Sequence, residues 1–205
     1  MIKEQTTSDV KERILIVARD LFTKNGFNGT SIRDIAAASE TNVAMVNYYF
    51  RSKYNLFEII FEEAFDVLIR RVFNILDSEI PFFDIIEKWI NAYYELLIEY
   101  PQIPIFILNE INQNPERLTE RIKRRNPFRI FLRISARIED EVQKGTIRET
   151  PSVDFVLNVL ALCVFPFMFE GLATKVANKS IEEYNELLIQ HQKYVVDFVI
   201  NAIKK

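Results

Sequence analysis

Very few side chains in this sequence have the chemistry of a catalytic centre. Its 205 residues include one histidine, His191, and one cysteine, Cys163. A Ser-His-Asp or Cys-His site needs a histidine beside its nucleophile, and a cysteine-based zinc site needs several thiolates. Cys163 lies inside an apolar run and His191 on the apolar side of a helical pattern, so both are predicted to be packing residues. We therefore expect no enzyme activity, no metal site and no cofactor.

A group of polar side chains between residues 30 and 53 has the chemistry of nucleic-acid contacts instead. Hydroxyl groups and cations can bind phosphate oxygens, and the exposed face of a helix can meet base edges in the major groove. Residues 1–57 also carry 8 Lys and Arg against 6 Asp and Glu, whereas residues 58–205 carry 18 against 23. The pattern favours binding of double-stranded DNA, and the alternative is a small helical subdomain with a solvated surface.

Three short helices are predicted to position these side chains. The first spans Val10–Asn25, and the second begins at Ser31, which has capping-box spacing to Asp34. After a tight turn, Asn42 can cap a third helix at Val43–Phe50. Three short helices with a tight turn between the last two are typical of a helix-turn-helix module.

The remainder of the chain also has its apolar residues at helical spacing. A fourth helix is predicted from Lys53, capped by Ser52, into the low seventies. Later helices are predicted over about 82–100, 104–112, 115–144 with an interruption at Asn126-Pro127, 152–175 and 181–202. The predicted fold class is therefore all-α. Its N-terminal head comprises residues 1–50, with the start of the fourth helix to about 57, and its helical body comprises residues 51–205.

Two runs in the head resemble the DNA-binding domain of the TetR family of transcriptional regulators. They are Thr30-Ser31-Ile32-Arg33-Asp34-Ile35-Ala36 and Val46-Asn47-Tyr48-Tyr49-Phe50-Arg51-Ser52-Lys53-x-x-Leu56. The likeness covers roughly residues 10–57 without a gap. The family usually has glycine in the turn, where this chain has Glu40. If that position needs a left-handed backbone, a residue other than glycine costs about 1 kcal/mol.

The resemblance implies a ligand-responsive transcriptional regulator that is not an enzyme. It predicts a repressor that binds operator DNA as a homodimer and is released by a small, apolar effector. Carried over by position, the resemblance assigns contacts with base edges to Arg33, Val43, Met45 and Asn47. It assigns contacts with phosphates to Thr30, Ser31, Asn42, Tyr48, Tyr49 and Lys53. Ala44 completes the predicted DNA-binding set.

The resemblance also implies an effector pocket between the helices of the body. Such pockets are lined by apolar and aromatic side chains with a few polar groups. The residues assigned to it are Trp89, Tyr93, Phe106, Phe128, Phe131, Phe165 and Phe169. The alternative for these aromatic residues is a place in the hydrophobic core.

Two apolar segments of the body predict a dimer interface. Residues 155–169 are apolar all round, and the last helix carries an apolar stripe, which together exceed what one body is expected to cover. Paired across a two-fold axis, they would form a four-helix interface, the usual arrangement by family resemblance. The interface residues are predicted to be Phe155, Val159, Leu188, His191, Val195 and Phe198.

The sequence also predicts the compartment in which the protein works. Residues 1–9 are polar and do not resemble a signal peptide, and the uncharged stretch 155–169 is expected to be too short to span a membrane. A cytoplasmic protein without a membrane partner is predicted. The alternative function is that of an all-helical protein that binds a hydrophobic ligand but does not bind DNA.

Overall fold

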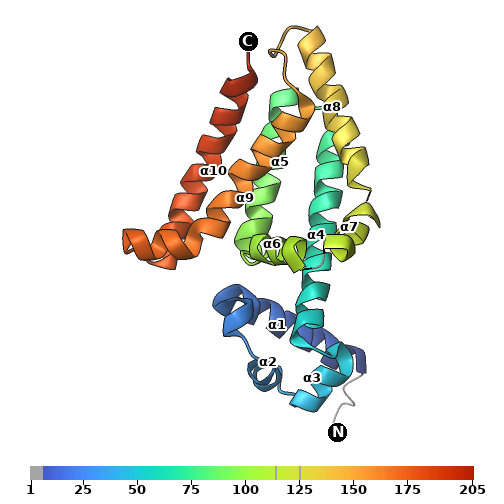
Figure 1. The fold of residues 1–205 in the computed structure, drawn as a ribbon, viewed down its shortest axis with the longest axis vertical. Coiled ribbons are helices and arrows are strands. Elements are labelled where there is room, and N and C mark those ends of the chain that lie inside the picture. Colours follow the sequence, from blue (N-terminus) through green and yellow to red (C-terminus); the bar gives the residue numbers. More distant parts are fainter. Residues whose placement is uncertain (1–6, 114, 125) are drawn as a thin grey trace. The chain divides into compact units, whose positions relative to one another are not determined.

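The computed structural model describes residues 7–113, 115–124 and 126–205. These residues form ten helices (Figure 1): α1 (Thr7–Gly29), α2 (Ile32–Ala38), α3 (Val43–Phe50), α4 (Lys53–Asp77), α5 (Phe82–Glu99), α6 (Ile103–Gln113), α7 (Pro115–Arg124), α8 (Pro127–Gln143), α9 (Ser152–Ala177) and α10 (Ile181–Ile203). An isolated antiparallel bridge joins Ile147 to Lys204. The predicted all-α fold is confirmed.

The chain divides into two compact units, which we call the head, residues 1–65, and the body, residues 66–205. The division falls inside α4, whereas the sequence places the boundary at residue 50, before that helix begins. A continuous helix has no loop or change of composition to mark where its contacts pass from one unit to the other. The boundary at residue 50 stays a prediction.

An aromatic cluster lies at the centre of the head. The ring centroid of Phe22 lies 5.1 Å from that of Phe57 and 5.7 Å from that of Phe27, and the Phe27 and Phe57 centroids are 5.2 Å apart. Gly26 interrupts α1 with φ 73°, a backbone conformation that favours glycine. The remaining core is built from buried apolar residues of the four head helices: Ile14, Ala18, Ile35, Ala36, Val46, Phe50, Leu56, Ile60, Phe61 and Ala64.

The turn between α2 and α3 is a Schellman motif with glutamate at the usual glycine position. The N–H of Thr41 donates to the carbonyl of Ala36 at 2.9 Å, and the N–H of Glu40 donates to the carbonyl of Ala37 at 3.2 Å. Glu40 has φ 51°, in the left-handed region. It therefore adopts the conformation that glycine would take, and the turn keeps its shape at a cost in backbone strain.

Helix α5 forms the centre of the body and packs against both α9 and α10 (Figure 1). Its buried residues are Phe82, Ile85, Ile86, Trp89, Ile90, Ala92, Tyr94, Leu96 and Leu97. The facing side of α10 buries Leu188, Val195, Val199 and Ile203. Three helices that share one interior in this way bury most of the apolar surface of α5.

Helix α9 differs from the expectation that it is buried on most sides. It buries the stripe Phe155, Val159, Cys163 and Phe167, while Leu157 on another side is 58% exposed. The helix is also long and apolar enough to cross a membrane by length and composition, because it extends beyond residues 155–169 in both directions. The expectation that this segment is too short is thus wrong, although one such helix is also common in the core of soluble proteins.

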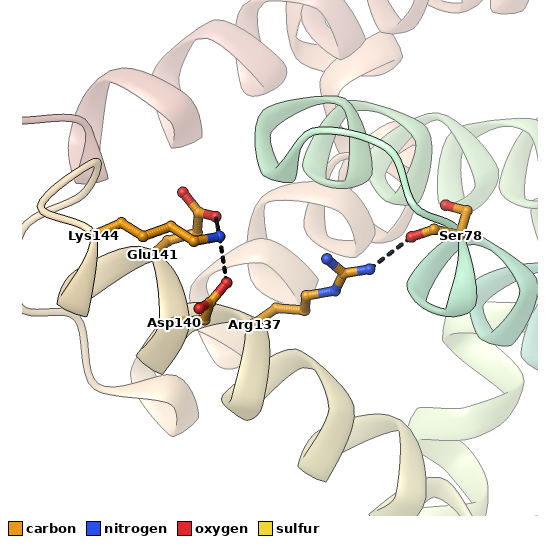
Figure 2. Close-up of polar contacts among 5 residues, drawn as sticks. All are labelled: Ser78, Arg137, Asp140, Glu141 and Lys144. Atoms are coloured by element: carbon orange, nitrogen blue, oxygen red, sulfur yellow. Dashed lines mark hydrogen bonds and ion pairs between the residues drawn. The ribbon is translucent and has the colours of Figure 1, made fainter.

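Two arginines of α8 hold the C-terminal end of α4. The Arg133 guanidinium forms an ion pair with Asp77 and lies 5.7 Å from the ring centroid of Phe73. Arg137 donates from its guanidinium to the carbonyl of Ser78 at 2.6 Å (Figure 2). Cations at a helix C-terminus are favourable because the last carbonyls of the helix have no partner within it.

Replacing Glu40 with glycine is expected to raise the free energy of unfolding by about 0.5–1 kcal/mol, since glycine adopts a positive φ without the steric cost. Urea unfolding followed by circular dichroism measures the change. The matched variant Glu40→Ala removes the same carboxylate but keeps the strain, so it should show no gain. An equal gain in both variants would assign the effect to charge rather than to the backbone.

Candidate nucleic-acid interface

Helix α3 presents one face of its eight residues to solvent. Val43, Ala44, Asn47 and Tyr48 are exposed, and Tyr48 is 79% exposed. Val46 and Phe50 point the other way into the core of the head, together with the apolar sides of α1 and α2. This face combines an amide, a phenol and small apolar groups, which are the groups that hydrogen-bond base edges and contact thymine methyls in a major groove.

Side-chain caps fix where α2 and α3 begin. Ser31 Oγ accepts from the N–H of Asp34 at 3.2 Å, and an oxygen of the Asp34 carboxylate accepts from the N–H of Ser31 at 2.8 Å. Hydrogen bonds to the Asp34 carboxylate from the hydroxyl and the backbone N–H of Ser31 lower the pKa of Asp34. Asn42 Oδ1 accepts from the N–H of Met45 at 2.8 Å. The predicted capping box and the predicted Asn42 cap are confirmed.

Two residues that were assigned to phosphate contacts point inward instead. Thr30 is 1% exposed, and its hydroxyl donates to the carbonyls of Leu21 at 3.1 Å and Gly26 at 2.9 Å. Lys53 Nζ donates to the carbonyls of Phe27 at 2.8 Å and Thr30 at 3.0 Å, and lies 4.2 Å from the Phe27 ring centroid. Both residues hold the junction of α1, α2 and α4, so the assignment of phosphate contacts to them is corrected.

The other residues assigned to DNA contacts lie at the surface to different degrees. The exposed ones are Ser31, Arg33, Asn42, Val43, Ala44, Asn47 and Tyr48, and the half-buried ones are Met45 and Tyr49. The rings of Tyr48 and Tyr49 lie edge to face with centroids 5.2 Å apart. Most of the predicted set therefore occupies one continuous segment of the head surface, and its DNA contacts stay a prediction.

Arg13 takes part in positioning the turn, although the sequence analysis did not select it. Its guanidinium Nε donates to the carbonyl of Ser39 at 2.8 Å, which ties α1 to the end of α2. The Ser39 hydroxyl is fully buried and donates to the carbonyl of Ile35 at 2.6 Å. Arg13 and Ser39 are 26 positions apart, and a helical pattern does not show which distant carbonyl a surface arginine will reach.

The aromatic residues assigned to an effector pocket are distributed over four helices. They form three pairs and one single residue: Trp89 with Tyr93, Phe128 with Phe131, Phe165 with Phe169, and Phe106. Phe165 and Phe169 line an open cleft of about 470 Å³ between α9 and α10, together with Tyr184, Leu187, Leu188, Gln190, His191, Tyr194 and Pro166. The sequence placed these aromatics together, whereas the fold separates them because their helices present different faces to the interior.

Trp89 and Tyr93 form a buried pair within this set. Trp89 is 2% exposed, and the side chain of Tyr93 is the polar group with which its indole interacts. The ring centroid of Trp89 lies 6.4 Å from that of Tyr93, whose pKa is raised by burial.

Four of the six residues assigned to a dimer interface are buried inside the body itself. Phe155, Val159, Leu188 and Val195 are each at most 5% exposed in the single chain, so they are core residues and the interface assignment is corrected. Helical spacing identifies an apolar side but not the element that covers it. Phe198, 50% exposed, and half-buried His191 remain at the surface.

The only histidine of the sequence is held by a tyrosine of α5. Its Nδ1 lies 2.6 Å from Tyr94 Oη, in a pair that joins α5 to α10. Burial lowers the pKa of His191. Because Nδ1 is engaged and the ring sits beside aromatic neighbours, its arrangement is that of a packed side chain.

Acidic side chains near the end of α8 bind a neighbouring lysine. Lys144 Nζ lies 2.5 Å from a carboxylate oxygen of Asp140 and 2.9 Å from one of Glu141 (Figure 2). These hydrogen bonds raise the pKa of Lys144. Within the part of the chain that the structure describes, no three His, Cys, Asp or Glu residues gather to hold a metal ion.

Comparison with known proteins identifies the N-terminal segment. Residues 14–60 match the family model of bacterial regulatory proteins of the tetR family. The chain is 43% identical over 49 residues, 24% of its length and 26% of that protein, to the HTH-type transcriptional regulator QacR of Staphylococcus aureus. It is 41% identical over 56 residues, 27% of each protein, to the "Probable HTH-type transcriptional regulator YttP" of Bacillus subtilis. Each match spans about a quarter of the relative's length.

Solved structures extend the likeness to the whole fold. The TetR family transcriptional regulator PfmR from Thermus thermophilus superposes with a TM-score of 0.65 over 90% of this chain and 97% of that chain. The two sequences are 21% identical over that length. The body therefore shares the fold of that regulator, while the sequence likeness with the curated relatives is confined to the head.

The variant Lys53→Ala is expected to lower the free energy of unfolding by about 1–3 kcal/mol, because it leaves the carbonyls of Phe27 and Thr30 without their charged donor. Lys53→Met, which keeps the apolar stem, separates loss of the ammonium from loss of packing. Urea unfolding measures both variants. If neither variant is destabilised, the ammonium does not hold this junction.

Proposed function

We propose that this chain, a member of the TetR family of bacterial regulatory proteins, is a transcriptional regulator that binds operator DNA. The observation that carries the proposal is the exposed face of α3, with Asn47 and Tyr48 at its centre, inside the segment that matches the family. Capping by Asn42 and the turn at Glu40 give that short helix a defined start. Because a bacterial regulator of this kind acts on a promoter, we propose that the protein works in the cytoplasm.

We propose further that the regulator is a homodimer joined through α9 and α10. Leu157, Phe165 and Phe169 of α9 and Tyr194 and Phe198 of α10 are exposed apolar residues. Residues of both helices line the same cleft, so their exposed sides adjoin. Exposed apolar surface of this extent is typical of an interaction site, and a second copy would cover it with the same two helices.

A small effector that weakens DNA binding completes the proposal. The buried pair of Trp89 and Tyr93, an indole beside a phenol, favours an amphipathic molecule, with an apolar portion among the aromatic residues and a polar group that reaches one of these two side chains. An effector that binds better to a conformation with low operator affinity shifts the population toward that conformation. By linkage, bound operator DNA lowers the affinity for the effector by the same factor by which the effector lowers the affinity for DNA. The protein would then act as a repressor.

A gel-shift experiment with genomic fragments around the protein's own gene tests the central proposal. A retarded band that resists excess random duplex supports a regulator. The alternative is a ligand-binding protein that does not bind DNA. It would be favoured if no retarded band forms while small apolar compounds, screened separately, still raise the melting temperature of the protein. Compounds that raise the melting temperature are then added to the gel shift, where an effector should weaken the retarded band.

Asn47 is expected to recognise a base. Replacing it with alanine should cost about 1–3 kcal/mol on the preferred duplex, because an asparagine amide can pair with an adenine edge in the major groove. The loss on random DNA at the same salt concentration should be small. Fluorescence anisotropy with both duplexes measures the difference. Equal losses on the two duplexes would mean that Asn47 does not discriminate between sequences.

Phe198→Glu is expected to weaken the dimer at least tenfold, because it places an unpaired charge in a dry contact. Sedimentation at micromolar concentration should show about twice 24.2 kDa for the unaltered protein and a growing monomer fraction for the variant. The matched control is Phe128→Glu on α8, which is 63% exposed and lies outside the α9–α10 surface. A monomer for the unaltered protein contradicts the proposal. Soluble aggregates larger than a dimer would also contradict it, because they would show that a single second copy does not cover the apolar surface.

A further inference from the structure

We propose that Arg51 binds a DNA phosphate and takes the role that the sequence pattern assigned to Lys53. The inference rests on the proposed DNA binding and deepens it by naming a contact residue. It starts from a deficit of charge at the interface. Thr30 and Lys53, two of the residues expected to grip the backbone, are committed to carbonyls inside the head.

Most cations of the described part of the head are likewise occupied. Four of them contact groups within the head: Arg13 with the Ser39 carbonyl, Arg19 with Glu63, Lys24 with Asp20, and Lys53 with two carbonyls. Lys11, Arg33 and Arg51 are exposed, and their side chains make no hydrogen bond or ion pair to a described residue. Of these three, Arg51 directly follows α3, Arg33 lies in α2, and Lys11 lies in α1.

Arg51 is the residue that directly follows α3 and caps its C-terminal end. It is exposed and lies four residues after Asn47 and three after Tyr48, although its positive φ turns its side chain out of the helical row. Its N–H still donates to the carbonyl of Asn47 at 2.8 Å, so the helical register extends to this residue. A guanidinium at this point would adjoin the base-contacting face, where the flanking phosphates of a bound duplex lie.

The backbone of Arg51 is strained, and a residue other than glycine at such a position indicates that its side chain has a use. Arg51 has φ 63° and ψ −41°, and the N–H of Ser52 donates to the carbonyl of Phe50 at 2.7 Å across it. This tight three-residue turn is rare and unfavourable for residues with a Cβ atom, whereas glycine adopts a positive φ freely. Strain of this kind tends to be kept at functional sites. The side chain is exposed and makes no hydrogen bond or ion pair with a described residue, so its guanidinium is available to an external anion.

The chemistry of arginine suits this role. Its guanidinium remains charged at neutral pH and can donate two parallel hydrogen bonds to phosphate oxygens. A phosphate contact carries no sequence information, so it strengthens binding to every duplex equally. Each phosphate that a protein neutralises steepens the slope of log K against log salt concentration by about 0.9.

The variant Arg51→Gly provides a test in which stability and DNA binding move in opposite directions. It should raise the melting temperature, because glycine relieves the strain. It should also weaken binding to specific and random duplexes by the same factor and reduce the salt slope by about 0.9. Arg51→Ala should reduce the slope equally without the gain in melting temperature, and Arg51→Lys should leave the slope unchanged.

Lys179→Ala, which removes an exposed cation of the body, is the matched control and should not alter the slope. If the unaltered protein fails to bind any duplex, the proposed function fails. If it binds and the slopes of Arg51→Gly and Arg51→Ala equal its own, the function stands and the assignment of Arg51 is overturned. A loss confined to the specific duplex would also overturn it, because that loss would identify a base contact.

Discussion

The arrangement of the head depends on where one ammonium group is held. Lys53 is the first residue of α4, and its Nζ binds the carbonyls of Phe27 and Thr30, where the chain leaves α1 and enters α2. The Phe27 carbonyl lies in the last turn of α1 and the Thr30 carbonyl follows that helix, so both need partners from elsewhere in the protein. Because Ser31 caps α2 immediately after Thr30, the same contact sets where α2 begins. The helix-turn-helix arrangement is therefore anchored from outside its own two helices.

A helix of eight residues cannot define its own direction, because isolated helices of that length are unstable in water. The direction of α3 is set instead by its two ends. Glu40 before it and Arg51 after it both have positive φ, at 51° and 63°. Each turn reverses the chain within a few residues and costs free energy that the buried side chains Val46 and Phe50 offset. An exposed face held at both ends is suited to entering a groove without rearrangement.

The body distributes its interactions differently on its two sides. On one side, Arg133 and Arg137 of α8 hold the end of α4 by an ion pair and a bond to a carbonyl. Such contacts between long side chains break at modest cost when partly exposed. On the other side, α9 and α10 carry contiguous exposed apolar surface. The partly exposed contacts between α8 and α4 therefore hold less firmly than the buried core around α5.

The sequence by itself determined the class of the fold and most helix limits, since helical spacing, caps and prolines act over only a few residues. Ser31 with Asp34 and Asn42 marked helix starts that the structure confirms, and the predicted interruption at Asn126-Pro127 is where α8 begins. The resemblance of the head to a known family was also readable, because its two motif runs, residues 30–36 and 46–56, are close together in the sequence. Only the tertiary structure decided which polar groups face solvent. Lys53 and Thr30 turn inward, and the stripe of α9 is core, because contacts between distant residues depend on how helices pack, which local spacing does not encode.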